Sequence, residues 1–118
     1  MNAGDIVLIS LPQVGGGPPK LRPALVLSLL PGPFQNVLIC GISTRVHDLV
    51  DNWDELIGMS DSDFSDSGLR RQSAIRPSYL YAADSTEIAG KIGHIDSARL
   101  QRVLKRLLDH LQLQPDFS

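Results

Sequence analysis

Short apolar segments separated by glycine and proline constrain the fold of this chain more than any other feature. Three such segments, residues 6–9, 24–30 and 37–42, occur before residue 43 and are too short to be ordinary helices. The second closes at Pro31-Gly32-Pro33, which leaves the third near enough to form a hairpin with it. The chain is therefore predicted to begin as an antiparallel sheet.

The second half of the sequence predicts further strands. Residues 69–83 and 88–95 have strand character, and a short strand is expected around residues 55–58. Pro77 interrupts the first of these segments and has no N–H to donate to a neighbouring strand. A bulge or a sheet edge is therefore predicted at Pro77.

The C-terminal segment has the pattern of an amphipathic helix at about residues 97–112. Asp96 is a good N-cap residue, and the apolar residues that follow it recur at helical spacing: Leu100, Val103, Leu104, Leu107, Leu108 and Leu111. We expect this apolar face to pack on the sheet. The other face carries Arg99, Arg102, Lys105 and Arg106 and is expected to be a solvated surface.

Length and cysteine content limit the class of protein. The 118 residues are 42% hydrophobic, which is enough for a single domain, predicted over residues 1–118. Cys40 is the only cysteine and lies in an apolar run, so a buried, reduced thiol is expected. No segment has the length of a membrane helix and no secretory leader is recognised, so we predict a cytoplasmic protein without membrane contact.

The charges are unevenly distributed along the chain. The net charge is only -2, but residues 46–68 contain no Lys or Arg and a concentration of acids: Asp48, Asp51, Asp54, Glu55, Asp61, Asp63 and Asp66. This long acidic loop is expected to be solvated, or alternatively to mimic nucleic acid. The rest of the chain is cationic, so a nucleic-acid partner remains open despite the acidic average.

Arg76 is the most informative single residue, because it lies in the apolar run from Ser73 to Ser78. Arginine is almost never buried without a partner. Arg76 therefore needs a carboxylate, a backbone carbonyl, the solvent edge or a ligand, and phosphate suits a planar guanidinium well.

The order of short motifs resembles the PemK/MazF family of bacterial toxin endoribonucleases. The resemblance covers nearly the whole chain and is carried by Gly4–Leu8, Leu21–Ser28, Ile42–Arg45, Gly68-Leu69, Ser73–Ser78 and Lys91–Gly93, followed by the leucine-rich helix. It implies a mainly β fold, an SH3-like antiparallel β-barrel with a C-terminal helix. It also implies a homodimer, a cognate antitoxin, and cleavage of single-stranded RNA through its own 2′-hydroxyl without a metal or another cofactor.

The resemblance also implies catalytic residues. Arg76 matches the catalytic arginine and would stabilise charge at the scissile phosphate; the alternative is a structural arginine paired with a carboxylate such as Asp84. Ser43 and Thr44 match a hydroxyl pair that can bind a phosphate oxygen, or that simply ends a strand. Ser78 stands where relatives often have an acidic residue, which leaves the general base unassigned.

Three further residues are candidates for substrate binding. Arg22 matches a family arginine before proline and either contacts RNA or holds the preceding loop. That loop offers only Lys20 where relatives often carry a histidine or a glutamate. His47 is the best replacement base by type, because its ordinary pKa of about 6.5 suits proton transfer.

Other functions stay open at this point. The same fold without catalysis would be a nucleic-acid-binding or gyrase-directed growth inhibitor, which the unassigned base favours. A peptide-binding SH3-like module is less favoured, because such grooves rely on aromatic residues and this chain has few. The Asp61-Ser62-Asp63 sequence does not have EF-hand spacing, so no metal site is predicted.

Overall fold

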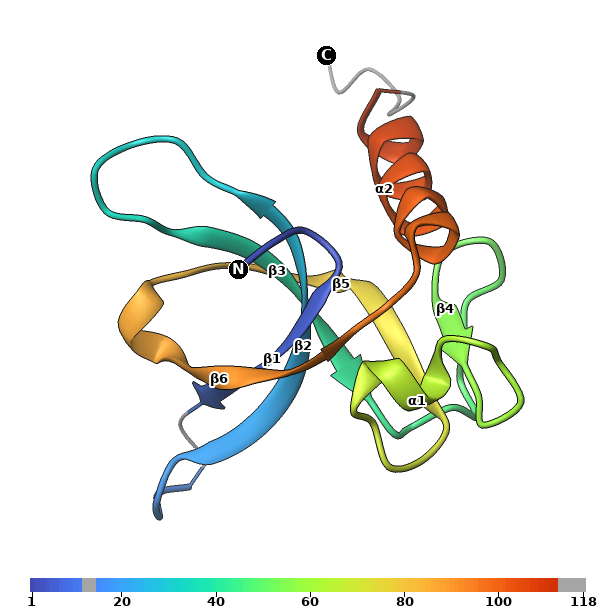
Figure 1. Ribbon diagram of the computed structural model, residues 1–118, viewed down its shortest axis with the longest axis horizontal. Helices are drawn as coiled ribbons and strands as arrows, with labels where there is room; N and C mark the ends of the chain where they lie inside the picture. The colour runs from blue at the N-terminus through green and yellow to red at the C-terminus, as the bar shows by residue number, and fades with distance from the viewer. Residues whose placement is uncertain (12–14, 113–118) are drawn as a thin grey trace.

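The fold is mainly β with a C-terminal helix, as the sequence predicts (Figure 1). A computed structural model describes residues 1–11 and 15–112. The strands are β1 (Asp5–Leu11), β2 (Lys20–Leu29), β3 (Val37–Ser43), β4 (Glu55–Ile57), β5 (Ser73–Ala83) and β6 (Ile88–His94). The helical elements are α1 (Phe64–Ser67), the 3-10 turn η1 (Ser85–Glu87) and α2 (Ser97–Gln112).

All strand pairs in the sheet are antiparallel, in the order β4-β5-β3-β2-β1-β6. The sheet curves strongly. Among the described residues β4 and β6 each pair on one side only, so the sheet does not close into a barrel. The fold class is confirmed. β2 starts earlier than the predicted strand, and this places Lys20, Arg22 and Pro23 inside the sheet.

Each face of the curved sheet carries a cluster of buried side chains, which explains the continuous apolar runs of β1 to β3. Successive side chains of a strand point to opposite faces. One buried cluster accordingly holds Ile6 and Leu25, whereas their neighbours Val7 and Val26 belong to a second cluster. Cys40 lies in the first cluster, and its burial raises the pKa of the thiol to about 12, as expected for an inert cysteine.

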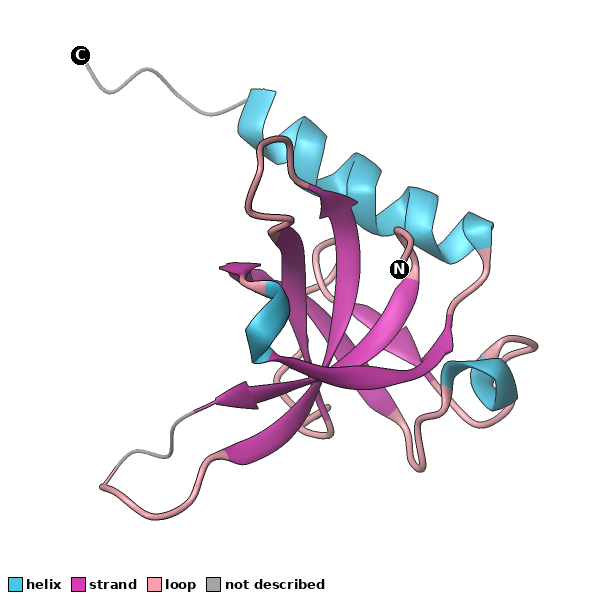
Figure 2. Cartoon of the chain, turned by 60° about the vertical axis from the view of Figure 1, so that its left-hand side comes forward, coloured by secondary structure: helices cyan, strands magenta, loops and turns pink. Residues whose placement is uncertain are grey.

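Helix α2 occupies the predicted residues and lies along one side of the curved strands (Figure 2). The backbone N–H of Arg99 donates to Asp96 Oδ1 at 2.8 Å, which confirms Asp96 as the residue that caps the helix. Val103 and Leu107 are buried against the first cluster. No helix in the described part of the chain is long and apolar enough to span a bilayer.

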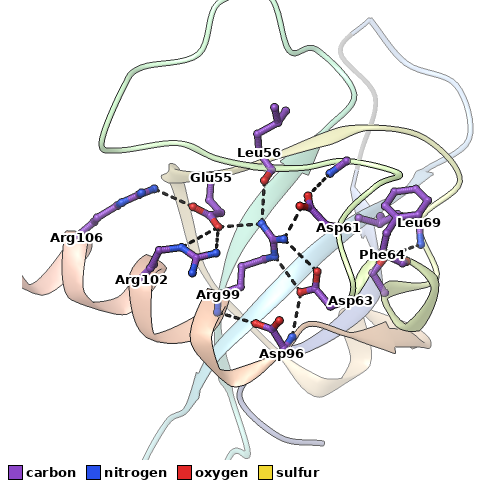
Figure 3. A network of polar contacts seen from close by, with 12 residues as sticks. Glu55, Leu56, Asp61, Asp63, Phe64, Leu69, Asp96, Arg99, Arg102 and Arg106 are labelled. Carbon is purple, nitrogen blue, oxygen red and sulfur yellow. Dashed lines mark hydrogen bonds and ion pairs between the residues drawn. The ribbon is translucent and has the colours of Figure 1, made fainter.

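On the cationic face of α2, Arg102 and Lys105 are exposed as expected, but Arg99 is not. Arg99 is only 5% exposed and binds the Asp63 carboxylate through two nitrogens, at 2.9 and 3.0 Å (Figure 3). It also donates to Glu55 and to the backbone carbonyl of Leu56, each at 2.8 Å. The prediction failed for Arg99 because this residue lies four positions before Val103 and therefore on the same side of the helix as the buried Val103 and Leu107.

Glu55 is the second centre of this network. The carboxylate of Glu55 is 7% exposed and accepts hydrogen bonds from Arg99, Arg102 and Arg106. Buried carboxylates require such partners, because an unpaired charge away from water is very unfavourable. Residues 46–68 are therefore no freely solvated loop: this segment contains β4 and α1, and its acids bind arginines of the fold.

Two glycines of the family motifs allow α1 to approach β6. A Cβ at Gly68 would lie 2.2 Å from the carbonyl oxygen of Ile92, and Gly68 has a left-handed φ of 74°. A Cβ at Gly93 would lie 2.2 Å from the carbonyl oxygen of Asp66. Neither position accepts a side chain without moving backbone, so the two glycines fix this contact.

Candidate functional site

A pocket of about 550 Å³ lies where the end of β3 meets β2 and β5. Its lining combines apolar residues of the sheet with arginines, hydroxyls and tyrosines: Ile9, Arg22, Pro23, Ala24, Ile39, Gly41, Ile42, Ser43, Thr44, Arg45, Ser73, Tyr79, Leu80 and Tyr81. Of the residues predicted from the sequence, the pocket brings together Arg22, Ser43 and Thr44.

Sheet register explains why these three residues meet. β2 and β3 run antiparallel with Ala24 opposite Gly41, so Arg22, two residues before Ala24, lies beside the end of β3 that carries Ser43. Ser43 Oγ accepts a hydrogen bond from the backbone N–H of Arg45 at 3.1 Å. This bond is the strand-ending role considered for Ser43, and it leaves the hydroxyl proton available to a ligand.

Arg45 lines the pocket, although the sequence did not single it out as a candidate. Its side chain is 66% exposed at the pocket, and its Nε lies 3.2 Å from Asp48 Oδ2. Its backbone carbonyl accepts a hydrogen bond from Arg76. The signal available in the sequence was its position directly after Thr44 in the motif.

Arg76 does not line the pocket. It is 7% exposed, and its guanidinium contacts Asp48 at 2.7 Å, Asp54 at 3.2 Å and the carbonyl of Arg45. Asp84, the carboxylate considered as its structural partner, instead caps η1 and accepts from the backbone of Thr86. The alternative of a paired arginine thus describes these contacts, with different carboxylates from the one considered.

Ser78 also lies outside the pocket lining. Its hydroxyl accepts a hydrogen bond from Trp53 Nε1 at 2.8 Å, and the Trp53 ring lies 5.0 Å from the ring of His110 on α2. Pairing along β5 passes from Leu80 opposite Cys40 to Arg76 opposite Gly41. This register shift confirms the irregularity predicted at Pro77, and Ser78 lies within it.

The two other predicted binding residues are exposed but do not line the pocket. Lys20 begins β2, paired with Leu11, and lies two residues before Arg22 on an exposed stretch of that strand. His47 lies in the connection that follows β3, next to Asp48. Their assignment to RNA binding stays a prediction.

The pocket is cationic and lined with hydroxyl groups. Among the described lining residues there is no carboxylate and no imidazole, and Arg22 and Arg45 are the cations. Partial desolvation favours the neutral form of Asp48, but the hydrogen bond from Arg76 and the charges of both arginines outweigh it and hold the Asp48 pKa below its usual value. Asp48 thus stays ionised and holds Arg45.

This arrangement suits an anion with three or four oxygens. Two guanidiniums supply charge and directed N–H groups, and two hydroxyls donate hydrogen bonds. No cluster of three or more His, Cys, Asp or Glu within residues 1–11 and 15–112 is arranged to hold a metal ion. The side chains that line the pocket are of the types that bind the oxygens of a phosphate.

Comparison with known proteins agrees with the resemblance seen in the motifs. A family model described as PemK-like, MazF-like toxin of type II toxin-antitoxin system matches residues 2–111. No curated protein matches the chain in sequence. The Mycobacterium tuberculosis toxin MazF-mt6 shares the fold with a TM-score of 0.64 and 16% identity, over 92% of this chain and 99% of its own.

A second solved structure is an endoribonuclease from a mycobacterial species in complex with its cognate antitoxin. It has a TM-score of 0.63 and 14% identity, over 98% of this chain and 99% of its own. At such identities the likeness shows the fold, whereas the family model spans nearly the whole sequence. This chain therefore belongs to the family of PemK-like, MazF-like toxins of type II toxin-antitoxin systems.

Proposed function

We propose that this toxin is an endoribonuclease that cleaves single-stranded mRNA at the pocket beside the end of β3. The observation that carries the proposal is the convergence of Arg22, Arg45, Ser43 and Thr44 on one pocket. These side chains offer charge and hydrogen bonds to a phosphate and its neighbouring oxygens. Membership of the toxin family supports RNA as the source of that phosphate.

The reaction that fits these groups uses the nucleotide's own 2′-hydroxyl. Its oxygen attacks the adjacent phosphorus while the bond from phosphorus to the 5′-oxygen breaks, which yields a 2′,3′-cyclic phosphate. The 2′-hydroxyl loses one proton and the leaving 5′-oxygen gains one. Arg22 and Arg45 would stabilise the negative charge that grows on the phosphate oxygens.

In this proposal Arg76 is a positioning residue. It donates to the backbone carbonyl of Arg45 and to the Asp48 carboxylate that also contacts Arg45. Arg76 thereby fixes the segment that follows Thr44 and sets where the Arg45 guanidinium can reach. Direct contact between Arg76 and the scissile phosphate would require the carboxylates of Asp48 and Asp54 to be displaced first.

The test is cleavage of labelled single-stranded RNA in EDTA by the full chain. We expect discrete fragments that end in a 2′,3′-cyclic phosphate, and a loss of about a hundredfold or more in rate for Arg22→Ala. Arg70→Ala, which removes an exposed cation outside the pocket lining, is the matched control and should cleave normally. Ser78→Ala should retain activity if its hydroxyl serves only Trp53.

A second candidate function keeps the binding and drops the cleavage. The observation that favours it is the lack of a carboxylate or imidazole among the described lining residues, which leaves proton abstraction without an obvious base. Such a protein would act as a nucleic-acid-binding or gyrase-directed growth inhibitor. Intact RNA that nevertheless binds the wild-type protein would select this function over the nuclease.

The partners proposed for this chain are a cognate antitoxin and a second copy of the toxin. The mycobacterial endoribonuclease solved with its antitoxin supports the first. Co-purification with the product of a short acidic reading frame beside the gene would test it, and light scattering would test the homodimer. Because mRNA is the proposed substrate, the cytoplasm is the proposed location.

A further inference from the structure

The part of the pocket that β5 contributes consists of large, exposed side chains. Tyr79 is 62% exposed, and Leu80 and Tyr81 are each 43% exposed. Neighbouring apolar side chains that stay in contact with water commonly mark a binding surface. Tyr79 and Tyr81 are the aromatic residues among the described lining of this pocket.

The backbone holds Tyr79 in place although its ring is exposed. Pro77 and Ser78 precede it in the irregular part of β5, where Pro77 is fully buried and Ser78 is bound to Trp53. The Tyr79 ring lies against Gly41, since a Cβ there would be 3.1 Å from Tyr79 Cβ and 3.4 Å from Cδ2. The ring therefore lies against the backbone of β3, two residues before Ser43.

Tyr81 is fixed in a different way. Its hydroxyl donates to Glu87 Oε2, and the other oxygen of Glu87 accepts from the backbone N–H of Asp84 at 2.9 Å. The second bond belongs to the capping box of η1, so a structured turn holds the tyrosine. A ring that is already held loses little conformational freedom when a ligand binds.

We propose that Tyr79 and Tyr81 stack on bases of the bound RNA that neighbour the phosphate held by Arg22 and Arg45. This inference rests on the proposed function and assigns a second kind of contact to the same site. The end of β3 and β2 would bind the backbone of the strand, and β5 would bind its bases. Base faces are available to side chains only in an unpaired strand, so this contact selects single-stranded RNA.

The experiment compares two short single-stranded probes with each protein by fluorescence anisotropy. One is a random-sequence 2′-fluoro RNA, which cannot be cleaved through a 2′-hydroxyl, and the other has the same backbone without bases. We expect the wild type to bind the base-bearing probe more tightly. Tyr79→Leu should remove most of that preference, a loss of about 5- to 150-fold for a stacked base, and Tyr81→Leu should act similarly.

Three further variants separate stacking from other effects. Tyr79→Phe keeps the ring and should bind like the wild type. Arg45→Ala should weaken both probes by the same factor, because it acts on the backbone. Phe34→Ala removes a 75% exposed aromatic ring outside the pocket lining and should change neither probe. Circular dichroism and thermal melting verify that each variant is folded.

The outcomes distinguish this inference from the proposed function. If the wild type cleaves RNA but binds both probes equally, stacking is excluded and the nuclease survives. If Tyr79→Leu and Tyr81→Leu both keep the preference for bases, other residues make that contact and the inference fails. If the wild type neither binds nor cleaves RNA, both proposals fall together.

Discussion

The guanidinium of Arg76 donates a hydrogen bond to the backbone carbonyl of Arg45, across 31 residues of sequence. Arg76 is buried, whereas the side chain of Arg45 is 66% exposed at the pocket. The buried arginine thus holds the segment that carries the exposed one. Asp48 strengthens this relationship, because one of its oxygens contacts Arg76 and the other contacts Arg45.

Asp48→Asn tests whether Arg76 acts through Arg45. The variant keeps an acceptor oxygen but loses the charge that holds both guanidiniums, so kcat/KM for RNA should fall by about ten- to a hundredfold, as expected when a substrate contact is displaced. The measurement is steady-state cleavage. Should Arg76 contact the phosphate directly, removing this competing charge would leave the rate unchanged or raise it.

Arg45→Ala should change the salt dependence of RNA binding. Each phosphate contact on a single strand contributes about 0.7 to the slope of log K against log salt concentration. We therefore expect a slope that is shallower by about that amount, measured by anisotropy with the 2′-fluoro probe. Lys105→Ala, on the exposed face of α2, is the control, and an equal change in both variants would argue for general attraction instead of a contact at the pocket.

Gly41→Ala should disturb the Tyr79 ring. The new Cβ would lie 3.1 Å from Tyr79 Cβ, so the tyrosine or the strand must shift, at a cost of about 1–3 kcal/mol in the free energy of unfolding. The affinity for the base-bearing probe should fall as well. Gly90→Ala is the matched control, because no atom lies within 4 Å of its Cβ position. Equal unfolding curves for the two variants would contradict the close contact.

Asp63→Asn should reduce stability and its dependence on pH. The hydrogen bonds from Arg99 hold the Asp63 pKa below its usual value, so this pair stabilises the fold above the unfolded pKa near 3.8 and is lost as pH falls through the folded pKa. We expect a loss of about 1.5–3 kcal/mol at pH 7, because Arg99 loses its hydrogen bonds to the Asp63 charge but keeps those to Glu55 and the carbonyl of Leu56. Urea unfolding followed by Trp53 fluorescence at pH 7 and in acid measures both effects.

Acidification should distinguish the wild type from Asp63→Asn by how much stability each protein loses. The wild type should lose more stability between neutral and acid pH than the variant does, because the variant has no carboxylate there to protonate. Asp51→Asn, at an exposed carboxylate, should behave like the wild type. Parallel loss of stability in the wild type and Asp63→Asn would show that the pair contributes nothing to acid unfolding.

Cys40 should not react in the native protein. Its pKa is raised to about 12 by burial, so almost no thiolate exists at neutral pH, and the sulfur is also inaccessible. We expect modification by a thiol reagent only in denaturant, with a rate in native buffer that follows global unfolding. Rapid labelling of the folded protein would contradict the packing of β3 in the core.

The sequence predicted the elements of this fold well because their signals are local. The apolar runs of β1 to β3, the helical spacing after Asp96 and the break at Pro77 each depend on neighbouring residues. Ser43 and Arg22 were found through motifs, and sheet register then brought them to one pocket. Local patterns and short motifs were sufficient for these features.

The partners of the arginines depend on contacts that local patterns do not encode. Arg76 was expected to need a partner, but Asp48 and Asp54 reach it through the path of a long connection. Arg99 looked like a surface residue, although its spacing of four from Val103 indicated the buried stripe. Only the arrangement of residues 46–68 against β5 and α2 shows which carboxylates these arginines bind.

The network around Arg99 also limits how this family member can change over generations. Glu55 and Asp63 share the Arg99 guanidinium in a place with little water, but Glu55 also binds Arg102 and Arg106, so the loss of Arg99 leaves the Asp63 charge without its cation. A lineage that loses Arg99 is therefore expected to lose Asp63 nearly at the same time. In an alignment of close relatives, these two positions should vary as a pair, and an unpaired Asp63 should be rare.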